Sequence, residues 1–568
     1  MLRNLINFSK DLPGSFFRKD KSHGSALWNF LTVGIALLIS IPVFTILASI
    51  FIPAGEIWSH LVSTVLPDYV KNSLILMFGV GAGVFILGVG TAWIVTMCKF
   101  PGQKIFDWAL ILPMAVPAYL MAYTYTDVFA FTGPVQSLLR DLFGWGIGDY
   151  WFPNIRSIEG AVIMMSFVFY PYVYLLSRTA FLEQSTSLLE ASRSLGCTPW
   201  QSFYKIALPL ARPSIAAGMA LALMETLNDF GTVDYFGVQT FTTGIYRTWF
   251  GLGEQAAAAQ LSGFLLLFVL ILILLERWSR SRISYKQGGA GRYKNLNTYK
   301  LSGVKAWAST LFCSLPLLIG FIIPVVILTE MMISNFEAAV NARFFQYALN
   351  TLLVGSVAGA MALLIAILMA YGIRLNPTLI TKTSTRIASM GYAIPGSVIA
   401  VGILIPFGWF DNTLDAWMRD TFGISTGLIL SGTIVALIFA YIVRFLAVAF
   451  TTVEASLSKV TPNMDEAAEG LGYRFRTILA KVHIPMISGS MFAALMLVFV
   501  DVIKELPATL IVRPFNFDTL AVQVYRLASD ERLAESSGAA LAIVLVGIIP
   551  VMILSRSMAR SRTINNKK

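Results

Sequence analysis

Charged residues are scarce in this sequence. Asp, Glu, Lys and Arg make up 13% of its 568 residues, whereas an ordinary soluble domain carries about 25%. Cysteine and histidine are rarer still, with three of each. Cys98, Cys197 and Cys313 are scattered in or near apolar stretches, so we interpret them as packing residues. These shortages exclude an ordinary soluble domain, a disulfide framework and a cysteine-based metal centre.

A nucleotide-binding motif is also missing. The sequence contains no GxxxxGK[ST] loop, the motif whose backbone N–H groups cradle nucleotide phosphates. We therefore do not expect the chain to bind ATP, and we predict neither catalytic residues nor a bound cofactor. A stable metal site is not expected either.

Apolar residues are abundant instead. They make up 56% of the chain, and its mean hydropathy is +0.71. A membrane span needs about 20 mostly apolar residues, and its backbone groups must be satisfied within a helix. The sequence predicts an all-α polytopic membrane protein with about 12 transmembrane helices. The apolar runs lie near residues 27–52, 73–97, 108–131, 158–181, 214–236, 260–276, 307–331, 348–372, 386–409, 426–450, 488–511 and 538–556.

The net charge of +11 is concentrated in three patches. The tail up to Ala26, the segment Glu276–Ala306 and the tail from Arg556 carry +3, +7 and +5. Basic residues flanking spans mark the cytoplasmic side, so we expect both termini and the central segment there. An even number of spans then separates the patches, and a nucleic-acid partner is not expected.

The chain repeats itself at a nearly constant offset. Four landmark pairs are separated by 276 to 279 residues: Asn72 and Asn350, Pro117 and Pro395, Glu190 and Glu466, Tyr246 and Tyr525. Such a period indicates duplication. We predict two homologous six-helix halves in parallel orientation, with the pathway between them. The predicted segments are a tail at 1–26, a half at 27–276, a basic cytoplasmic linker at 277–306, a half at 307–556 and a tail at 557–568.

A helix–bend–helix segment is predicted between the fourth and fifth spans of each half, at about 185–212 and 461–488. In the first copy Gly196 ends one helix, and Thr198 with Pro199 begins the next. We expect Pro209 to close that second helix. Gly472 and Pro485 stand in the same places in the second copy. A protrusion of this kind suits the docking of a partner.

These segments resemble the coupling loop of ABC-transporter permeases of the binding-protein-dependent import type. That signature reads Glu-Ala-Ala, three residues, Gly, nine residues, Ile-x-Leu-Pro. The first copy departs from it at Ser192, and the second copy departs at Val482 and Ile484. The residues that match and that we assign to coupling are Glu190, Ala191, Gly196, Pro209, Glu466, Ala467, Gly472 and Pro485.

The resemblance implies the partners. It indicates a permease subunit in a bacterial inner membrane, with two copies of a separate ATP-hydrolysing subunit docked on the coupling loops. ATP would be used by that partner, so this chain is not itself an enzyme. A solute-binding protein would deliver the cargo from outside. An ion-coupled secondary transporter also has twelve spans, but that class does not predict the paired motif.

The cargo is indicated by two further stretches, which begin ETLNDFGTVDYFG at Glu225 and DVIKELPATLIVR at Asp501. Both resemble the fifth span and following loop of ferric-iron importers, so we expect iron(III). Fused two-half permeases also resemble thiamine transporters, and thiamine, phosphonate or polyamine cargo stays open.

Four carboxylates stand at matched positions of the fifth spans: Glu225 with Asp501, and Asp229 with Glu505. Each half holds its pair at i, i+4, which predicts one helix face. A charge at mid-bilayer costs at least about 2.5 kcal/mol, so we expect these acids to face a pathway between the halves. Carboxylate oxygens suit a hard cation.

Other roles remain open for these acids and for several polar residues. Lys504 could pair with Asp501, and loop arginines such as Arg247 and Arg526 could bind the acids. His483 is expected to face the ATPase or water. Three tyrosines of the fourth span could supply phenolic oxygens, but anchoring at the membrane interface is favoured; they are Tyr170, Tyr172 and Tyr174.

Overall fold

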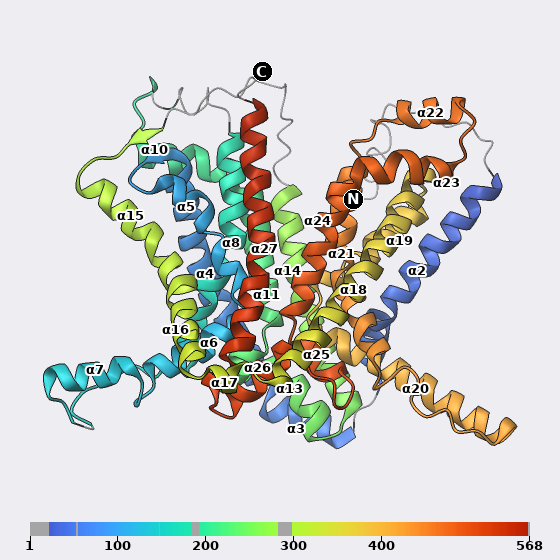
Figure 1. Cartoon of the computed structure of the whole chain (residues 1–568), viewed down its shortest axis with the longest axis horizontal. Helices are drawn as coiled ribbons and strands as arrows, with labels where there is room; N and C mark the ends of the chain where they lie inside the picture. The colour runs from blue at the N-terminus through green and yellow to red at the C-terminus, as the bar shows by residue number, and fades with distance from the viewer. Residues whose placement is uncertain are drawn as a thin grey trace.

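The protein is described by a computed structural model that covers residues 22–52, 55–146, 148–184, 192, 194–281 and 298–565. Within these residues 11 helices are long and apolar enough to cross a membrane, or 12 if one pair bent by 90° counts as a single span. The prediction of an all-α polytopic protein with about 12 spans is confirmed (Figure 1).

The helices of the first half follow the predicted spans with short helices between them. They are α2 (Ser22–Ser49), α3 (Gly55–Thr64), α4 (Leu66–Met97), α5 (Gln103–Ala109), η1 (Leu112–Ala115), α6 (Ala118–Phe129), α7 (Pro134–Phe143), α8 (Ile158–Glu183), α10 (Pro199–Ser202), η2 (Phe203–Ala207), α11 (Leu208–Asn228), α12 (Gly231–Tyr235), α13 (Phe241–Tyr246), η3 (Arg247–Gly251) and α14 (Gln255–Ser281).

The second half repeats this order. Its helices are α15 (Val304–Leu317), η4 (Leu318–Ile322), α16 (Ile323–Ser334), α17 (Phe336–Ala339), α18 (Ala342–Leu375), α19 (Leu379–Ala388), η5 (Gly391–Ala393), α20 (Gly396–Phe422), α21 (Ile434–Leu457), α22 (Pro462–Gly470), α23 (Phe475–Ile478), η6 (Leu479–His483), α24 (Ile484–Ile503), α25 (Pro507–Val512), α26 (Leu520–Ser529) and α27 (Leu533–Asn565).

The two coupling segments lie at the same end of the bundle. Figure 1 shows α10 and α22 at its top, where α2 also begins and α27 also ends. The short helices α3, α13 and α26 lie at the opposite end. This arrangement agrees with an even number of crossings in each half.

The two halves exchange their outer spans. The first core (among others Val80, Val168 and Ile215) is built on α4, α8 and α11, and it also contains residues of α15, α16 and α27. The second core, built on α18, α21 and α24, also contains residues of α2 and α14. Accordingly α2 packs on α19 and α20, and α15 packs on α4 and α5. Each core thus combines spans two to five of one half with spans one and six of the other.

The third span of each half is broken at a proline. Pro117 and Pro395 directly precede α6 and α20, and the residues before them are extended, with ψ of 115° at Val116 and 128° at Ile394. A residue before proline is driven out of the helical region by the proline ring. The break therefore follows from the matched prolines, and it divides each predicted third span into two helical segments.

Part of the predicted linker is attached to the first half. Tyr299–Lys300 pairs in parallel with Cys98–Lys99 as a two-stranded sheet, and Leu301 N donates to Lys99 O at 3.1 Å. The end of the segment 277–306 is thus fixed against α4, and helix α15 starts soon after it. Residues 282–297 lie outside the described residues.

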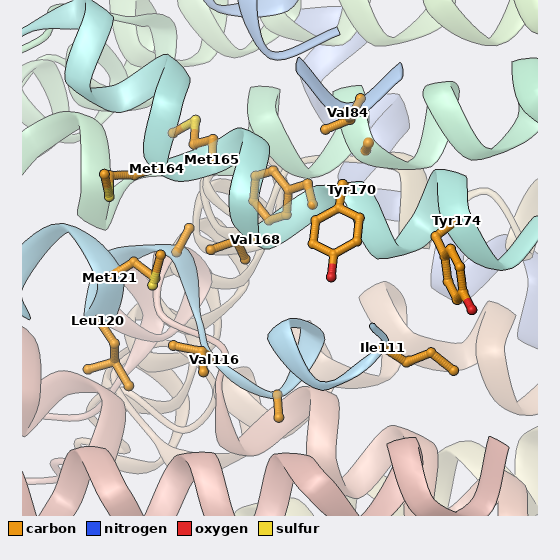
Figure 2. Packing of buried hydrophobic residues seen from close by; sticks show 14 of the residues in the cluster. Val84, Ile111, Val116, Leu120, Met121, Met164, Met165, Val168, Tyr170 and Tyr174 are labelled. Carbon is orange, nitrogen blue, oxygen red and sulfur yellow. The ribbon is translucent and has the colours of Figure 1, made fainter. Parts of the chain in front are cut away.

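Two of the three tyrosines of the fourth span are core residues. Figure 2 shows Tyr170 and Tyr174 on one side of α8, facing the segment that carries Ile111. Both are fully buried, and their hydroxyls donate to Leu110 O at 2.8 Å and Asp107 O at 3.0 Å. The expectation of interfacial anchoring is wrong for these two, because their hydroxyls satisfy carbonyls freed where the third span is broken.

Candidate functional site

The fifth span of each half ends earlier than predicted. Helix α11 ends at Asn228 and α24 ends at Ile503. Asp229 has extended backbone with ψ of 135°, and Glu505 lies two residues beyond its helix. The prediction that each pair of acids projects from one helix face is therefore wrong, because only the first acid of each pair is helical.

The second acid of each pair caps the short helix that follows. Asp229 Oδ1 accepts from Thr232 N at 3.0 Å and from Val233 N at 3.2 Å, at the start of α12. Glu505 accepts from Ala508 N and Thr509 N, both at 2.9 Å, at the start of α25. A carboxylate satisfies the unpaired N–H groups at a helix start. These two acids hold the chain where it turns.

All four predicted acids nevertheless line one cavity between the halves. The cavity has about 730 Å³ of empty space, counting the solvent at its mouth. It lies where the broken third spans and the ends of the fifth spans meet. Besides the acids its polar or charged lining consists of Tyr119, Tyr172, Asn228, Tyr392, Arg444 and Lys504.

Two of the acids are neutralised inside this cavity. Lys504 Nζ lies 2.8 Å from Asp501 Oδ1, and Arg444 Nη1 lies 3.1 Å from Glu505 Oε1. The alternative that Lys504 pairs with Asp501 is thus realised. Arg526, which lies in α26, instead pairs with Asp518 at 3.3 Å.

Glu225 differs from Asp501 and Glu505, which are paired with cations, and from Asp229, which caps a helix. It is half-buried on α11 and lines the cavity. Within the described part of the chain its carboxylate makes no ion pair. Four acids and two bases in one cavity leave an excess of negative charge, and Glu225 and Asp229 are the two acids that make no ion pair among the described residues.

An amide joins the halves at the cavity. Asn228 Oδ1 accepts from Gly396 N at 2.7 Å and from Arg444 Nη1 at 3.0 Å. The Arg444 and Glu505 side chains are 7% and 1% exposed, so the network is shielded from water. Sequence reasoning missed Arg444, although a single base inside the apolar run 434–450 is a signal for a functional position.

Tyrosine side chains, which carry phenolic oxygens, also line the cavity. Tyr172 and Tyr392 face it from α8 and from the segment that precedes Pro395. The suggestion of phenolic oxygens therefore fits Tyr172 alone among the three tyrosines. Among the described residues, no three His, Cys, Asp or Glu side chains stand close enough to hold a metal ion.

A further contact joins the halves at the end away from the coupling segments. Tyr525 Oη donates to Asp234 Oδ2 at 2.8 Å. Burial and the neighbouring Asp234 carboxylate raise the pKa of the Tyr525 phenol well above its usual range, so it remains a donor. This bond connects α26 with α12, the short helix whose start is capped by Asp229.

The coupling segments bend where predicted. Gly196 and Gly472 have φ of +79° and +81°, and the space beside each is open. Leu195 and Leu471, which precede them, are 84% and 78% exposed. Glu466 and Ala467 lie exposed on α22, whereas Glu190 and Ala191 lie outside the described residues.

The two prolines of the coupling motif do not end a helix. Pro209 and Pro485 lie in the first turn of α11 and α24, each after a π-helical turn whose last bond runs over five residues, from Leu208 N to Phe203 O and from Ile484 N to Leu479 O. Proline clashes with the carbonyl four residues earlier, and the wider π turn relieves that clash. The expectation that these prolines close the helix is wrong. Each coupling segment is instead continuous with the helix that carries Glu225 or Asp501.

The second coupling segment is braced by an ion pair and a hydrogen bond that share Asp465. Arg374 Nη2 lies 2.8 Å from Asp465 Oδ2, and His483 Nε2 lies 2.6 Å from Asp465 Oδ1. The His483 side chain is 1% exposed, and its ring packs edge-on against Tyr371. The expectation that His483 faces a partner or water is wrong, because this brace encloses it.

Known proteins with similar sequences agree with this arrangement. The sequence profile of the family described as binding-protein-dependent transport system inner membrane component matches residues 85–285 and again residues 362–564. The chain is 25% identical to the Fe(3+)-transport system permease protein FbpB 2 of Haemophilus influenzae, over 86% of this chain and 90% of that protein. It is 24% identical to the ferric transport system permease protein FbpB of Actinobacillus pleuropneumoniae, over 84% of this chain and 70% of that protein.

A shorter relative matches only part of the chain. The molybdenum transport system permease protein ModB of Escherichia coli is 28% identical over 38% of this chain and 92% of its own length. The two profile matches together cover more than half of the chain and reproduce its duplication. This chain therefore belongs to the family of binding-protein-dependent transport system inner membrane components, and as a multi-pass inner membrane protein it carries the family domain twice.

Proposed function

We propose that this chain is the permease of an ATP-driven importer for iron(III). Two copies of a separate ATP-hydrolysing subunit dock on the bends at Gly196 and Gly472, and a solute-binding protein delivers the ion at the opposite end. Both termini and the linker lie in the cytoplasm. Family membership favours a binding-protein-dependent importer over an ion-coupled secondary transporter.

The main support for this proposal is the cavity between the halves. It brings the matched acids Glu225 and Asp501 together with three tyrosines, where the two fifth spans end. Carboxylate and phenolic oxygens are hard ligands that suit a hard cation. A transport pathway requires binding that is weak enough for release, and ligands spread along a cavity meet this requirement.

The coupling segments give the cavity a mechanical connection. Because α10 and η2 continue into α11, and α23 and η6 into α24, a force on either bend acts on the helix that carries a cavity acid. Each fifth span then breaks at its capping acid, Asp229 or Glu505. Closing of the two ATP-hydrolysing subunits is thereby transmitted to the ends of both fifth spans.

An anionic cargo is the alternative that the relatives and two side chains favour. Molybdenum transport is named for one relative, and Arg444 and Lys504 line the cavity. Both cations are, however, already paired with carboxylates at 3.1 and 2.8 Å. The uncompensated charge in the cavity is negative, which favours a cation.

Uptake by membrane vesicles that contain the whole transporter tests the proposal. We expect Glu225→Gln to lower uptake of radiolabelled iron(III) at least tenfold, with expression and pull-down of the ATP-hydrolysing subunit unchanged. Asp229→Ala is the contrasting variant, because it removes the oxygens that accept from Thr232 N and Val233 N at the start of α12 and should instead lower the amount of folded protein. Wild-type iron uptake by Glu225→Gln, or uptake of molybdate in place of iron, would contradict the proposal.

A further inference from the structure

Two helical arms leave the bundle at the end opposite the coupling segments. One is α7, and the other is the outer part of α20, residues 409–422. Figure 1 shows both extending sideways, away from the other helices. The residues of α20 change from buried at 396–403 to mostly exposed beyond 408, which marks where this arm leaves the bundle.

The arms are a duplicated feature. Arg140-Asp141-Leu142-Phe143-Gly144 recurs as Arg419-Asp420-Thr421-Phe422-Gly423, 279 residues later. Both glycines have left-handed backbone, with φ of +64° and +68°, and end the helix. Their occurrence in both halves shows that the arms are part of the repeated unit.

Each arm has a bare apolar face. In α7 the apolar residues Val135, Leu138, Leu139 and Leu142 follow the i, i+3, i+4, i+7 spacing of one helix face. Leu138 and Leu142 are 58% and 68% exposed. In the α20 arm Phe410, Leu414, Trp417 and Met418 repeat the i, i+4, i+7, i+8 spacing, and Trp417 is 54% exposed.

The polar face of α7 is covered by the chain's own returning loop. Arg140 Nη1 donates to Phe131 O at 2.8 Å and to Tyr150 Oη at 3.1 Å. Tyr150 Oη in turn donates to Gln136 Oε1 at 2.8 Å. Protein groups thus satisfy the polar side of this arm.

The polar face of the α20 arm is covered in the same way. Asp411 Oδ2 accepts from Ser431 N at 2.7 Å. Asp415 Oδ1 accepts from Thr426 N at 2.7 Å and from Gly427 N at 3.0 Å. The loop that returns to α21 therefore lies along the acidic side of the arm, and the apolar side stays uncovered among the described residues.

Loops bind part of each polar face, whereas the apolar residues of both arms stay bare among the described residues. Such exposed apolar faces are unfavourable in water. We propose that both arms are interfacial membrane helices, which lie in the headgroup region of the leaflet far from the coupling segments. An amphipathic helix with aromatic and leucine residues on one face binds at this depth, and Trp417 is of the type enriched there.

The surrounding structure supports a lipid occupant. The arms continue directly from α6 and α20, whose first residues line or adjoin the cavity near Pro117 and Gly396. Their bare faces carry no charge that would complement a soluble protein. Anchoring two arms on opposite sides of the bundle would fix the depth of the broken third spans in the membrane.

Spin labels on the full-length protein test this inference. In a Cys98→Ala, Cys197→Ser, Cys313→Ala background, single cysteines replace Leu142 and Trp417 on the apolar faces. Asp141→Cys and Asn412→Cys are the matched controls, because they lie on the same helices outside the apolar faces. The labelled protein is reconstituted in vesicles of phosphatidylethanolamine and phosphatidylglycerol. Collision rates with oxygen, which enriches in lipid, and with a water-soluble nickel chelate are then measured.

We expect the ratio of oxygen to nickel collisions to be at least threefold higher at positions 142 and 417 than at their controls. Equal, water-like ratios at all four positions would overturn the inference. It would also be overturned if positions 142 and 417 become protected only when a solute-binding protein is added, since the bare faces would then dock protein. The measurement needs no transport, so it is independent of the proposed cargo.

Discussion

Asn228 and Gly396 meet across the boundary between the two halves, with Gly396 N donating to Asn228 Oδ1 over 2.7 Å. The same oxygen accepts from Arg444, which in turn is paired with Glu505. The side-chain amide of Asn228, in the first half, therefore binds both a backbone N–H group and the buried guanidinium of Arg444 in the second half. Because these groups are shielded from water, their contacts are stronger than similar contacts at a surface.

Substitution of Gly396 should break this network. A Cβ atom there would collide with the Arg444 guanidinium and lie 2.7 Å from Glu505 Oε1. We expect Gly396→Ala to lower the free energy of unfolding by about 1–3 kcal/mol, as overpacking of a filled site does. Thermal unfolding of the purified protein measures this. Gly408→Ala in the same helix is the control, because nothing lies within 4 Å of a Cβ atom there. An equal loss of stability in both variants would show that the loss does not come from crowding at Gly396.

The bend at Gly472 should tolerate few residues. Its φ of +81° costs an L-residue about 1–2 kcal/mol, although its surroundings are open. We expect Gly472→Ala to lower coupled ATP hydrolysis and transport, and Gly472→Asn to keep more of both, since Asn adopts this conformation more easily. Gly470→Ala, inside α22 with open space around it, should behave as wild type. Full coupling in Gly472→Ala would argue against docking at this bend.

The pair formed by Lys504 and Asp501 can be dissected by a double variant. Lys504→Met leaves Asp501, which is 18% exposed, without its cation, and we expect a loss on the order of 1–3 kcal/mol. Lys504→Met with Asp501→Asn should regain most of that stability, because no unpaired charge remains. If Asp501 also guides the cargo, iron uptake should stay low in the double variant. Recovery of both stability and uptake would restrict the pair to a structural role.

The charge pattern predicts the orientation of the chain. Single cysteines in the N-terminal tail, in Gly288–Gly291 and near Lys568 should react with a membrane-impermeant maleimide only in inverted vesicles or after permeabilisation. The reason is that the three basic patches stay on the cytoplasmic side. Labelling of any one of these positions in intact cells would break the six-plus-six topology.

Much of the fold could be predicted because it depends on local composition and on repetition. Spans of 20 or more apolar residues, the offset between Pro117 and Pro395, and the glycine bends are all visible in the sequence. The exchange of outer spans was not predictable, since nothing in α2 indicates whether its packing partners come from its own half or from the other. Packing between apolar surfaces in a membrane is not specified by hydropathy.

The candidate site was predicted in its residues but not in its geometry. The acids were identified by matched spacing, yet both acids of each pair were expected on one helix, whereas α11 and α24 end before Asp229 and Glu505. A carboxylate that accepts a hydrogen bond from the backbone N–H three residues later caps the start of a helix. Asp229 and Thr232 make this contact. Arg444 was missed because its partner Glu505 is distant in sequence.

The exchanged spans place a constraint on biogenesis. Helix α2 is made before the linker, but two of the helices it packs on, α19 and α20, are made only after it. Helix α27 is made after the linker, yet it packs on η1 of the first half. Neither core can close until nearly the whole chain has been inserted, so a nascent chain passes through a long interval with unfilled helix surfaces in the bilayer. Quality-control proteases could therefore distinguish an incomplete chain from a finished one by those unfilled surfaces alone.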